Sequence, residues 1–346
     1  MSLFAMPAAP LSLAAVRTCP PVAWVLHDGK AGMRSQALGL AEATGFDLIE
    51  KPLNIRRPWS SLPPQLWPRS RGVVVEGGMR LRPPWPDLVI GCGRNTVVPA
   101  LVIRRASGRR TILAQVQDPR LRHTEFDLLI VPEHDRLRGP QVIVSRGAMH
   151  RVTPARLAAE HSRFATLNAL RLNALRRPIV AVLLGGSSKA YRLGLRRLGE
   201  IADAIARMLR QSGGSALVTP SRRTGKEGTR LIEERLAGLP ATIWDGAGDN
   251  PYFAYLALAD AILVTADSVS MISEAAATGK PVHILELGGG NAKFARFHQS
   301  MRQAGITRPF AGHLETWSYP IPDDTARAGA AVRALVLSRL GEQHRA

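Results

Sequence analysis

The residues best suited to chemistry in this chain lie in four polar loops, each of which directly follows a short apolar run. The richest of these loops runs from Thr265 to Pro281, where an apolar run ends in Asp267-Ser268 and a helical segment begins. Ser268 or Ser270 can cap that helix, whose free N–H groups then face a phosphate group. Glu274 follows within two turns, where a carboxylate can accept hydrogen bonds from ribose hydroxyls. The pattern predicts a nucleotide site, and the alternative is that Glu274 is an ordinary surface residue of the helix.

Two more loops in the second half of the chain also suit an anion. Gly185-Gly186-Ser187-Ser188-Lys189 follows an apolar run, and its small residues, hydroxyls and cation at an expected helix start favour a phosphate group. It lacks the full pattern of a P-loop. The stretch 219–226 carries Arg222 and Arg223, which can grip phosphate oxygens through forked hydrogen bonds, unless the loop is a solvated turn.

The fourth loop, His27-Asp28-Gly29-Lys30-Ala31-Gly32, follows the first apolar run of the chain. Gly29 and Gly32 permit a ligand to approach the backbone closely, and the helix that follows favours an anion at its start. Asp28 is our preferred general base, and Lys30 adds a cation beside it. The alternative is a plain tight turn without a ligand.

Two further clusters follow strands of the first half and point to the same sheet edge. They are Gln117-Asp118-Pro119-Arg120 and Val131-Pro132-Glu133-His134-Asp135. A histidine between two carboxylates suits acid–base work, so His134 is the second candidate base. A hydrogen-bonded structural turn explains the same residues. We expect Asp118 and Arg120 to contact an acceptor or a phosphate group.

The loop from Trp244 to Tyr252 ends another apolar run of the second half. Asn250 can cap the following helix, with Pro251 at its first position. In a nucleotide site this loop would flank the base.

The elements that position these loops alternate between short apolar runs and helical segments, which is typical of parallel sheets built from βαβ units. Ligands of such sheets bind beyond the carboxyl ends of the strands. We therefore expect an α/β protein with two Rossmann-like parallel-sheet domains that face each other across a cleft. The expected parts are a leader at 1–20, an N-terminal domain at 21–153, a linker at 154–177, a C-terminal domain at 178–322 and a helix at 323–346 that folds back over the first domain.

The composition favours a folded, basic protein. Of 346 residues 45% are hydrophobic, and the formal net charge is +19, carried by 40 Arg and 6 Lys. The two cysteines have no metal-ligand spacing and fit a reducing compartment. A run of 18 apolar residues is absent from the sequence, so we expect a cytoplasmic protein with at most peripheral contact at the inner face of an anionic membrane. Nucleic acid is the least favoured partner, because zinc-finger spacings and aromatic RNA-binding motifs are missing from the sequence.

Eight motifs together resemble the mitochondrial fission family named for the plant elongated-mitochondria protein. In chain order between Val22 and Phe310 they are DGKAG, DPR, PEHD, SRGAMHRVT, LLGGSSKAY, TPSRRTG, DNPYFAYLALADAILVTADSVSMISEAAATGKPV and KFARFH. The resemblance implies a bacterial member with the GT-B architecture of glycosyltransferases and nucleotide-sugar enzymes. The plant member is regarded as an adaptor that recruits dynamin to mitochondria.

The segment ADSVSMISEAAATGKP is also similar to the donor site of the undecaprenyl-linked muropeptide N-acetylglucosaminyltransferase. In that enzyme a helix start meets the donor diphosphate and a glutamate holds the ribose. The similarity extends those roles to Ser268, Ser270 and Glu274 of this sequence. The loop that contains Asp28 stands in the place of that enzyme's N-terminal glycine-rich loop, but it has fewer glycines and an added Lys30.

The resulting hypothesis is a metal-independent glycosyltransferase that uses a nucleotide-diphosphate sugar, needs no cofactor and acts on a lipid-linked or cell-envelope acceptor. Metal independence is expected because an Asp-x-Asp motif is missing from the strand ends. The alternatives are a nucleotide-sugar epimerase or hydrolase on the same fold, or a non-catalytic adaptor. The expected donor residues are Gly185, Gly186, Ser187, Ser188, Arg222, Arg223, Asn250, Asp267, Ser268, Ser270 and Glu274. The expected acceptor or phosphate residues are Gly29, Lys30, Gly32, Asp118 and Arg120, with Asp28 and His134 as catalytic candidates.

Overall fold

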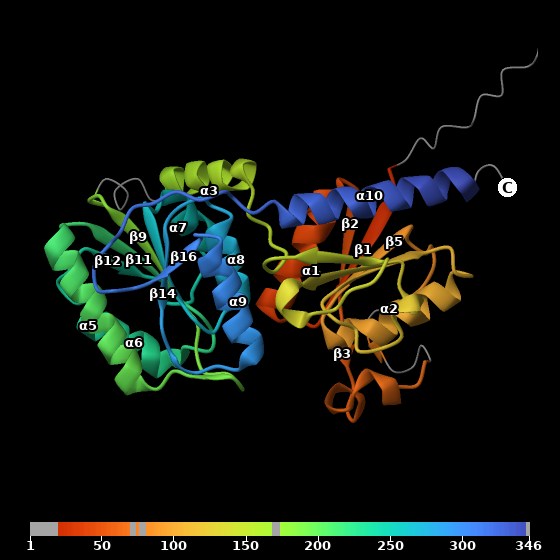
Figure 1. Cartoon of the computed structure of the whole chain (residues 1–346), viewed down its shortest axis with the longest axis horizontal. Helices are drawn as coiled ribbons and strands as arrows, with labels where there is room; N and C mark the ends of the chain where they lie inside the picture. The colour runs from red at the N-terminus through yellow and green to blue at the C-terminus, as the bar shows by residue number, and fades with distance from the viewer. Residues whose placement is uncertain (1–19, 70–73, 76–80, 168–173, 344–346) are drawn as a thin grey trace, which may run out of the picture.

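The computed structural model describes residues 20–69, 74–75, 81–167 and 174–343. The leader expected over residues 1–20 lies outside the described residues, apart from Pro20. Figure 1 shows two α/β halves side by side, with the N-terminal residues in one half and the middle of the chain in the other.

The first half is built on a parallel six-stranded sheet with the order β2-β1-β5-β6-β7-β8. Its strands are β1 (Val22–His27), β2 (Asp47–Pro52), β5 (Leu88–Cys92), β6 (Ile112–Val116), β7 (Leu128–Pro132) and β8 (Val142–Ser145). Its first two helices are α1 (Ala31–Thr44) and α2 (Arg94–Ala106). The strand order reverses between β1 and β5, which opens a crevice at the carboxyl ends of these strands.

The second half repeats this plan with the order β12-β11-β9-β13-β14-β16, and all its pairs are parallel. Its strands are β9 (Ile179–Leu184), β11 (Ser215–Pro220), β12 (Ala241–Ile243), β13 (Ala261–Thr265), β14 (Val282–Leu285) and β16 (Thr307–Pro309). Its helices are α5 (Leu195–Ser212), α6 (Gly225–Arg235), α7 (Tyr252–Leu258), α8 (Val269–Ala276) and α9 (Ala292–Gln303). The order reverses here between β9 and β13, so the expected α/β architecture of two parallel-sheet domains of the GT-B type is confirmed.

The central strands are buried and mostly apolar because helices cover both faces of each sheet. All six residues of β9 and all five of β13 are buried. Burial of such side chains stabilises a domain by roughly 25 cal/mol for each Å² of apolar surface removed from water. The sheets therefore form rigid platforms, and their carboxyl-end loops hold the polar residues.

Two helices outside the sheets join the halves. Helix α3 (Pro154–Leu167) leads from the first half to the second and packs on α7. Helix α10 (Asp324–Gln343) returns to the first half and packs along α1, where a Cβ at Gly329 would lie 2.4 Å from the Cβ of Ala43. At the start of α10, Asp324 Oδ2 accepts a hydrogen bond of 2.8 Å from the Arg146 backbone N–H. Figure 1 shows α10 running across the first half.

Two short antiparallel ribbons depart from the expected pattern. Strand β3 (Asn54–Ile55) pairs with β4 (Val74–Val75). Strand β10 (Tyr191–Arg192) pairs with β15 (Gly288–Gly289). The expectation that Lys189 opens a helix is therefore wrong, because this ribbon intervenes and α5 begins only at Leu195.

None of the helices that the structure describes is long and apolar enough to cross a membrane.

Candidate functional site

The two halves meet where α1 faces α8. Ser35 Oγ donates a hydrogen bond of 2.7 Å to Glu274 Oε1, and Gln36 Nε2 donates one of 3.2 Å to Ser270 Oγ. A Cβ at Gly32 would lie 3.2 Å from the same Ser270 oxygen. The loop after β1 and the start of α8 therefore face each other across the domain interface.

Glu274 is a buried carboxylate, 5% exposed, at this interface. One oxygen accepts the Ser35 hydroxyl, and the other accepts the Tyr252 hydroxyl at 2.6 Å. Burial raises the pKa of Glu274, although both hydrogen bonds and the charge of Arg151 oppose that rise. Two hydroxyl groups of the chain thus donate hydrogen bonds to the two oxygens of this carboxylate.

The loops after β9, β11 and β13 converge beside α8. The buried carboxylate of Asp267 lies 2.6 Å from Arg223 Nη1 and accepts a hydrogen bond of 3.2 Å from the Gly186 N–H. Arg223 Nη1 also donates to the Gly186 carbonyl at 3.0 Å. A Cβ at Gly185 would lie 2.2 Å from Asp267 Oδ1. Only a glycine fits there, because the carboxylate packs directly on its Cα.

Ser268 caps α8, since its Oγ accepts a hydrogen bond of 3.4 Å from the Met271 N–H. The first turn of a helix offers further N–H groups to an anion. Asp267 directly precedes the cap residue of that turn, and Arg223 balances the negative charge of its carboxylate. Arg222, next in the chain, is exposed.

Three other expected donor residues make local contacts in the structure. Ser188 Oγ accepts hydrogen bonds from the Ala190 and Tyr191 N–H groups at 3.2 and 3.1 Å, which closes the turn before β10. Ser187 Oγ accepts the Leu193 N–H at 2.9 Å. Asn250 Oδ1 accepts the Tyr252 N–H at 3.0 Å, at the start of α7. These side chains stabilise the loops that flank the convergence point.

Asp28 lies at the crevice between β1 and β5, where its side chain is 10% exposed. Its Oδ2 accepts a hydrogen bond of 3.0 Å from Asn95 Nδ2 on α2 and pairs with Lys30 Nζ. Gly29 adopts a φ of +76°, which glycine tolerates without strain. The crevice therefore presents one largely buried carboxylate with a cation beside it.

Sequence reasoning missed a second polar pair on this edge. His27 Nδ1 accepts the Gly29 N–H at 3.1 Å, so its Nε2 carries the proton and donates to Glu50 Oε1 at 2.7 Å. Arg34 Nη2 donates to the other oxygen of Glu50 at 2.9 Å. The Arg34 hydrogen bonds hold the pKa of Glu50 below its ordinary value. No local pattern predicts this pair, because the register of β1 on β2 brings it together.

The cluster after β6 is a tight polar turn. Asp118 Oδ1 accepts the Arg120 N–H at 2.8 Å, and both Gln117 and Arg120 have left-handed backbone, with φ of +73° and +53°. Such conformations in residues other than glycine are strained and cluster at binding sites. Gln117 Nε2 donates to Gln36 Oε1 at 3.3 Å, so this turn reaches the domain interface through α1.

His134 lies in the short 3-10 helix η5 (Glu133–Asp135), which packs on α9. Its ring is 4% exposed and meets Phe297 edge-on. Burial lowers the pKa of His134 to about 4. Three strand spacings separate β7 from β1, or about 14 Å, so His134 and Asp28 do not form one catalytic pair. Because the His134 side chain is buried and weakly basic, it is poorly placed for acid–base work. Asp28 remains the candidate base.

We expect the free energy of unfolding to fall as the pH drops from about 6.5 towards 4. Burial lowers the pKa of both His134 and His150 to about 4, whereas the unfolded chain binds these protons near pH 6.5. The unfolded state therefore takes up more protons in this window, and stability is lost at about 1.4 kcal/mol per pH unit for each histidine.

Urea unfolding across the window should show that the free energy of unfolding changes less steeply with pH in His134→Gln than in the wild type. His161→Gln, which removes an exposed histidine of α3, should leave the slope unchanged, and equal slopes in all three proteins would refute the assignment.

Comparison with known proteins identifies the family. The family model described as "Mitochondrial fission ELM1" matches residues 31–336. The mitochondrial fission protein ELM1 of Arabidopsis thaliana is 33% identical over 300 residues, which cover 78% of this chain and 68% of the relative. The chain belongs to the mitochondrial fission ELM1 family. The resemblance drawn from the eight motifs is thus confirmed.

Two solved structures with the same fold are UDP-GlcNAc 2-epimerases. The UDP-GlcNAc 2-epimerase of Methanocaldococcus jannaschii, in complex with UDP-GlcNAc and UDP, aligns with a TM-score of 0.52 at 15% identity, over 91% of this chain and 99% of that one. The UDP-N-acetylglucosamine 2-epimerase of Rickettsia bellii aligns with a TM-score of 0.50 at 13% identity, over 92% and 96%. At this level of identity the similarity shows only that the ELM1-family chain has the same fold. Its chemistry has to be inferred from the residues of the site.

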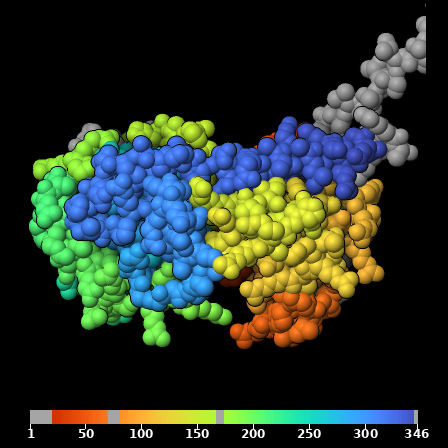
Figure 2. All heavy atoms as spheres, in the orientation of Figure 1, coloured from red at the N-terminus to blue at the C-terminus, as the bar shows by residue number. Residues whose placement is uncertain are grey.

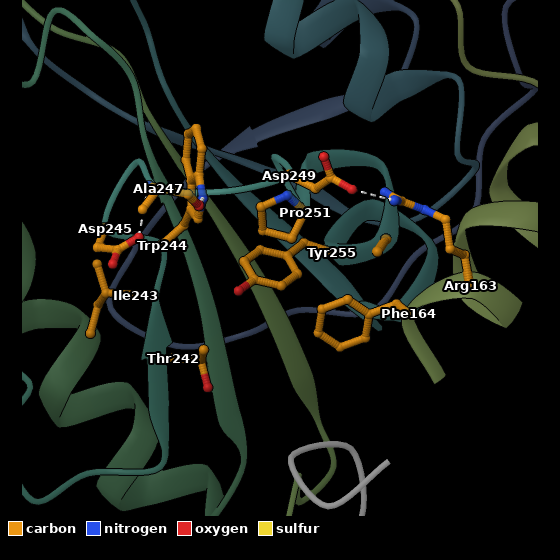
Figure 3. Close-up of a pocket in the computed structure, with 11 residues that line it drawn as sticks. Arg163, Phe164, Thr242, Ile243, Trp244, Asp245, Ala247, Asp249, Pro251 and Tyr255 are labelled. Atoms are coloured by element: carbon orange, nitrogen blue, oxygen red, sulfur yellow. Dashed lines mark hydrogen bonds and ion pairs between the residues drawn. The ribbon is translucent and has the colours of Figure 1, made fainter. Parts of the chain in front are cut away.

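A pocket of about 280 Å³ lies beside the loop expected to flank the base (Figure 3). It lies between α3 and α7, and Arg163 pairs with Asp249 across it at 2.8 Å. Tyr255 of α7 lines this pocket, whereas Tyr252 of the same helix contacts Glu274. Tyr252 and Tyr255 are one helical turn apart, and Glu274 itself is not among the described residues that line the pocket in this ELM1-family protein.

Among the described residues, no group of three or more His, Cys, Asp or Glu side chains is arranged to hold a metal ion.

Proposed function

We propose that this protein binds a nucleotide-diphosphate sugar between its two domains and transfers the sugar to an acceptor. The observation that carries the proposal is the convergence of three strand-end loops on the start of α8, directly opposite α1. That convergence places Asp267, Arg223 and Ser268 at one point, with Glu274 two turns further along. The fold that this chain shares with a UDP-GlcNAc 2-epimerase in complex with UDP-GlcNAc and UDP supports the same proposal.

In this proposal the diphosphate lies on the first turn of α8. The helix N–H groups, Ser268 and Ser270 bind its oxygens, and Arg222 and Arg223 stabilise the negative charge of the leaving group without a metal ion. Glu274 exchanges the Ser35 hydroxyl for a ribose hydroxyl. One O–H donor replaces another in that exchange, so the cost of opening the contact is small.

The acceptor lies on the side of the first domain. Asp28, held by Asn95 and next to Lys30, takes the proton from the acceptor hydroxyl as the attacking oxygen forms its bond to the sugar. A lipid-linked or cell-envelope glycan is the acceptor class that we propose. Peripheral contact with an anionic membrane fits the net charge of +19.

A thermal-shift comparison with nucleoside diphosphates and nucleotide sugars tests the proposal. A ligand at about 100 times its dissociation constant adds about 2.7 kcal/mol to the free energy of unfolding. The expected result is a higher unfolding temperature with one diphosphate nucleotide and its sugar derivative. Donor consumption that requires an acceptor supports the transferase, whereas turnover without an acceptor supports an epimerase or hydrolase.

The hydrogen bonds of Glu274 favour one second candidate, a non-catalytic adaptor. Both carboxylate oxygens already have partners within the chain, as expected of a residue that fixes the domain interface. A folded protein whose unfolding temperature does not respond to any nucleotide would support the adaptor and contradict the transferase.

A further inference from the structure

A second polar pocket of about 330 Å³ lies on the seam between the halves, away from the contact of α1 with α8. Its walls are η5 and the loops around β8 on one side and α9 on the other. Figure 2 shows the surface of these two parts meeting along the middle of the molecule. Its cationic lining comprises Arg136, Arg138 and Arg146 from the first domain and Arg296 from the second.

These four guanidinium groups are not neutralised. Within residues 20–69, 74–75, 81–167 and 174–343, none of the four forms an ion pair with a carboxylate, although Lys293 pairs with Asp135 nearby at 2.5 Å. Glu133 is the one carboxylate among the described residues that line the pocket. Its Oε2 accepts a hydrogen bond of 3.0 Å from Ser300. The pocket therefore carries an excess of positive charge on both domains.

Hydrogen bonds fix the side chain of Arg296 and the backbone of Arg136 and Arg146 at the pocket. Arg296 donates from Nε and Nη2 to the His134 carbonyl, at 3.1 and 2.8 Å. Three of its five N–H groups remain for a ligand. The Arg146 N–H is fixed to Asp324 on α10 at 2.8 Å. Arg136 has a left-handed backbone, with φ of +60°, and donates its N–H to the Glu133 carbonyl at 3.0 Å.

One buried polar atom in the wall of the pocket lacks a hydrogen-bond partner. His134 lines the pocket and is 4% exposed, yet its Nδ1 has no hydrogen-bond partner within the described structure. A buried polar atom without a partner costs free energy, so it marks a place where a bound group or a small shift is expected.

We propose that this pocket binds a phosphate group and that the bound phosphate bridges the two domains. Forked guanidinium N–H groups match the tetrahedral oxygens of a phosphate, and four of them can balance a dianion. The same chemistry is offered by a soluble phosphate ester and by a lipid headgroup with a terminal phosphate. The inference does not rest on nucleotide binding, because the pocket shares no residue with the convergence point at α8.

Isothermal titration of the full chain with inorganic phosphate tests the proposal. Arg146→Gln and Arg296→Gln should each weaken binding about tenfold, the loss expected for one charged hydrogen bond. Arg146 is exposed, so its replacement leaves the fold intact even if the change at Arg296 disturbs the interface. Arg302→Gln is the matched control, because it removes the same charge from an exposed position of α9 outside the pocket.

Arg223→Gln separates this site from the proposed donor site. If Arg223→Gln weakens phosphate binding and Arg146→Gln does not, the phosphate binds at α8 and the inference is wrong. Unchanged affinity in all variants would also overturn it. Sedimentation with phosphatidylcholine vesicles that contain phosphatidic acid then identifies the source. If the protein sediments with these vesicles, if this binding weakens as salt rises, and if both pocket variants lose it, the site takes a lipid headgroup. If the protein binds phosphate but does not sediment with the vesicles, the site takes a soluble phosphate ester.

Discussion

Glu274→Gln should weaken the binding of a nucleoside diphosphate about tenfold to hundredfold while the fold stays intact. A hydrogen bond to a charged acceptor contributes roughly 1.5–3 kcal/mol, or about one to two decades in dissociation constant. The glutamine keeps the shape of the side chain and can still bond to the Ser35 and Tyr252 hydroxyls, which can also accept from its amide. Isothermal titration measures the affinity, and circular dichroism checks the fold.

Pyrophosphate provides the control for this experiment because it has no ribose. Glu274→Gln should change pyrophosphate affinity much less than nucleotide affinity. Ser268→Ala should weaken both ligands, since its proposed role is at the phosphate end of the site. Equal nucleotide affinity in the wild type and Glu274→Gln would remove Glu274 from the site and leave it only the interface role that its contacts to Ser35 and Tyr252 describe.

Gly185→Ala should destabilise the second domain by about 1–3 kcal/mol, the range for overpacking a close-packed interior. The new Cβ would lie 2.2–2.6 Å from three atoms of the Asp267 carboxyl group, so that group must move. Its displacement breaks the contacts with Arg223 and with the Gly186 N–H. We expect a lower unfolding midpoint, by roughly 2–4 °C for each kcal/mol in a domain of this size, together with weaker binding of the diphosphate.

Gly199→Ala is the matched control in the same domain. A Cβ at Gly199 on α5 meets only Arg235 and Leu231, both at 3.9 Å, an ordinary van der Waals distance. Alanine in a helix is more favourable than glycine by roughly 0.5–1 kcal/mol, so this variant should melt slightly higher than the wild type. If Gly185→Ala were to melt at or above the wild-type temperature, the close approach of Asp267 to Gly185 would not hold in solution.

Much of the fold follows from local sequence. Helix α1 and strands β9 and β13 each have an unambiguous local signal in the sequence. Strand β9 is an unbroken apolar run between Pro178 and Gly185, which a strand buried on both faces requires. Ser268 marks the start of α8, because a hydroxyl can satisfy an N–H group that the first turn leaves free.

The short ribbon of β10 and β15 could not be predicted in this way. It joins Tyr191 to Gly289 and Arg192 to Gly288, nearly a hundred residues apart in the chain. A two-residue pairing has no period of its own, and β15 is a pair of glycines without a hydrophobic pattern. The wrong prediction of a helix start near Lys189 has the same cause, because the residues that form this ribbon resemble the start of a helix in their local sequence.

The sequence by itself determined which loops carry the chemistry and that they lie at the carboxyl ends of parallel strands. Apolar runs, glycines and capping hydroxyls act over a few residues, so they can be read along the chain. Only the tertiary structure decided the partners of each charged group: Glu274 with Ser35 and Tyr252, Asp267 with Arg223, and four unpaired arginines on the seam. Those partners depend on how α3 and α10 dock the two halves and on the register of neighbouring strands. Contacts between residues hundreds of positions apart leave no periodic trace in the sequence, and for that reason the burial of Glu274 and of His134 appears only once the domains are packed.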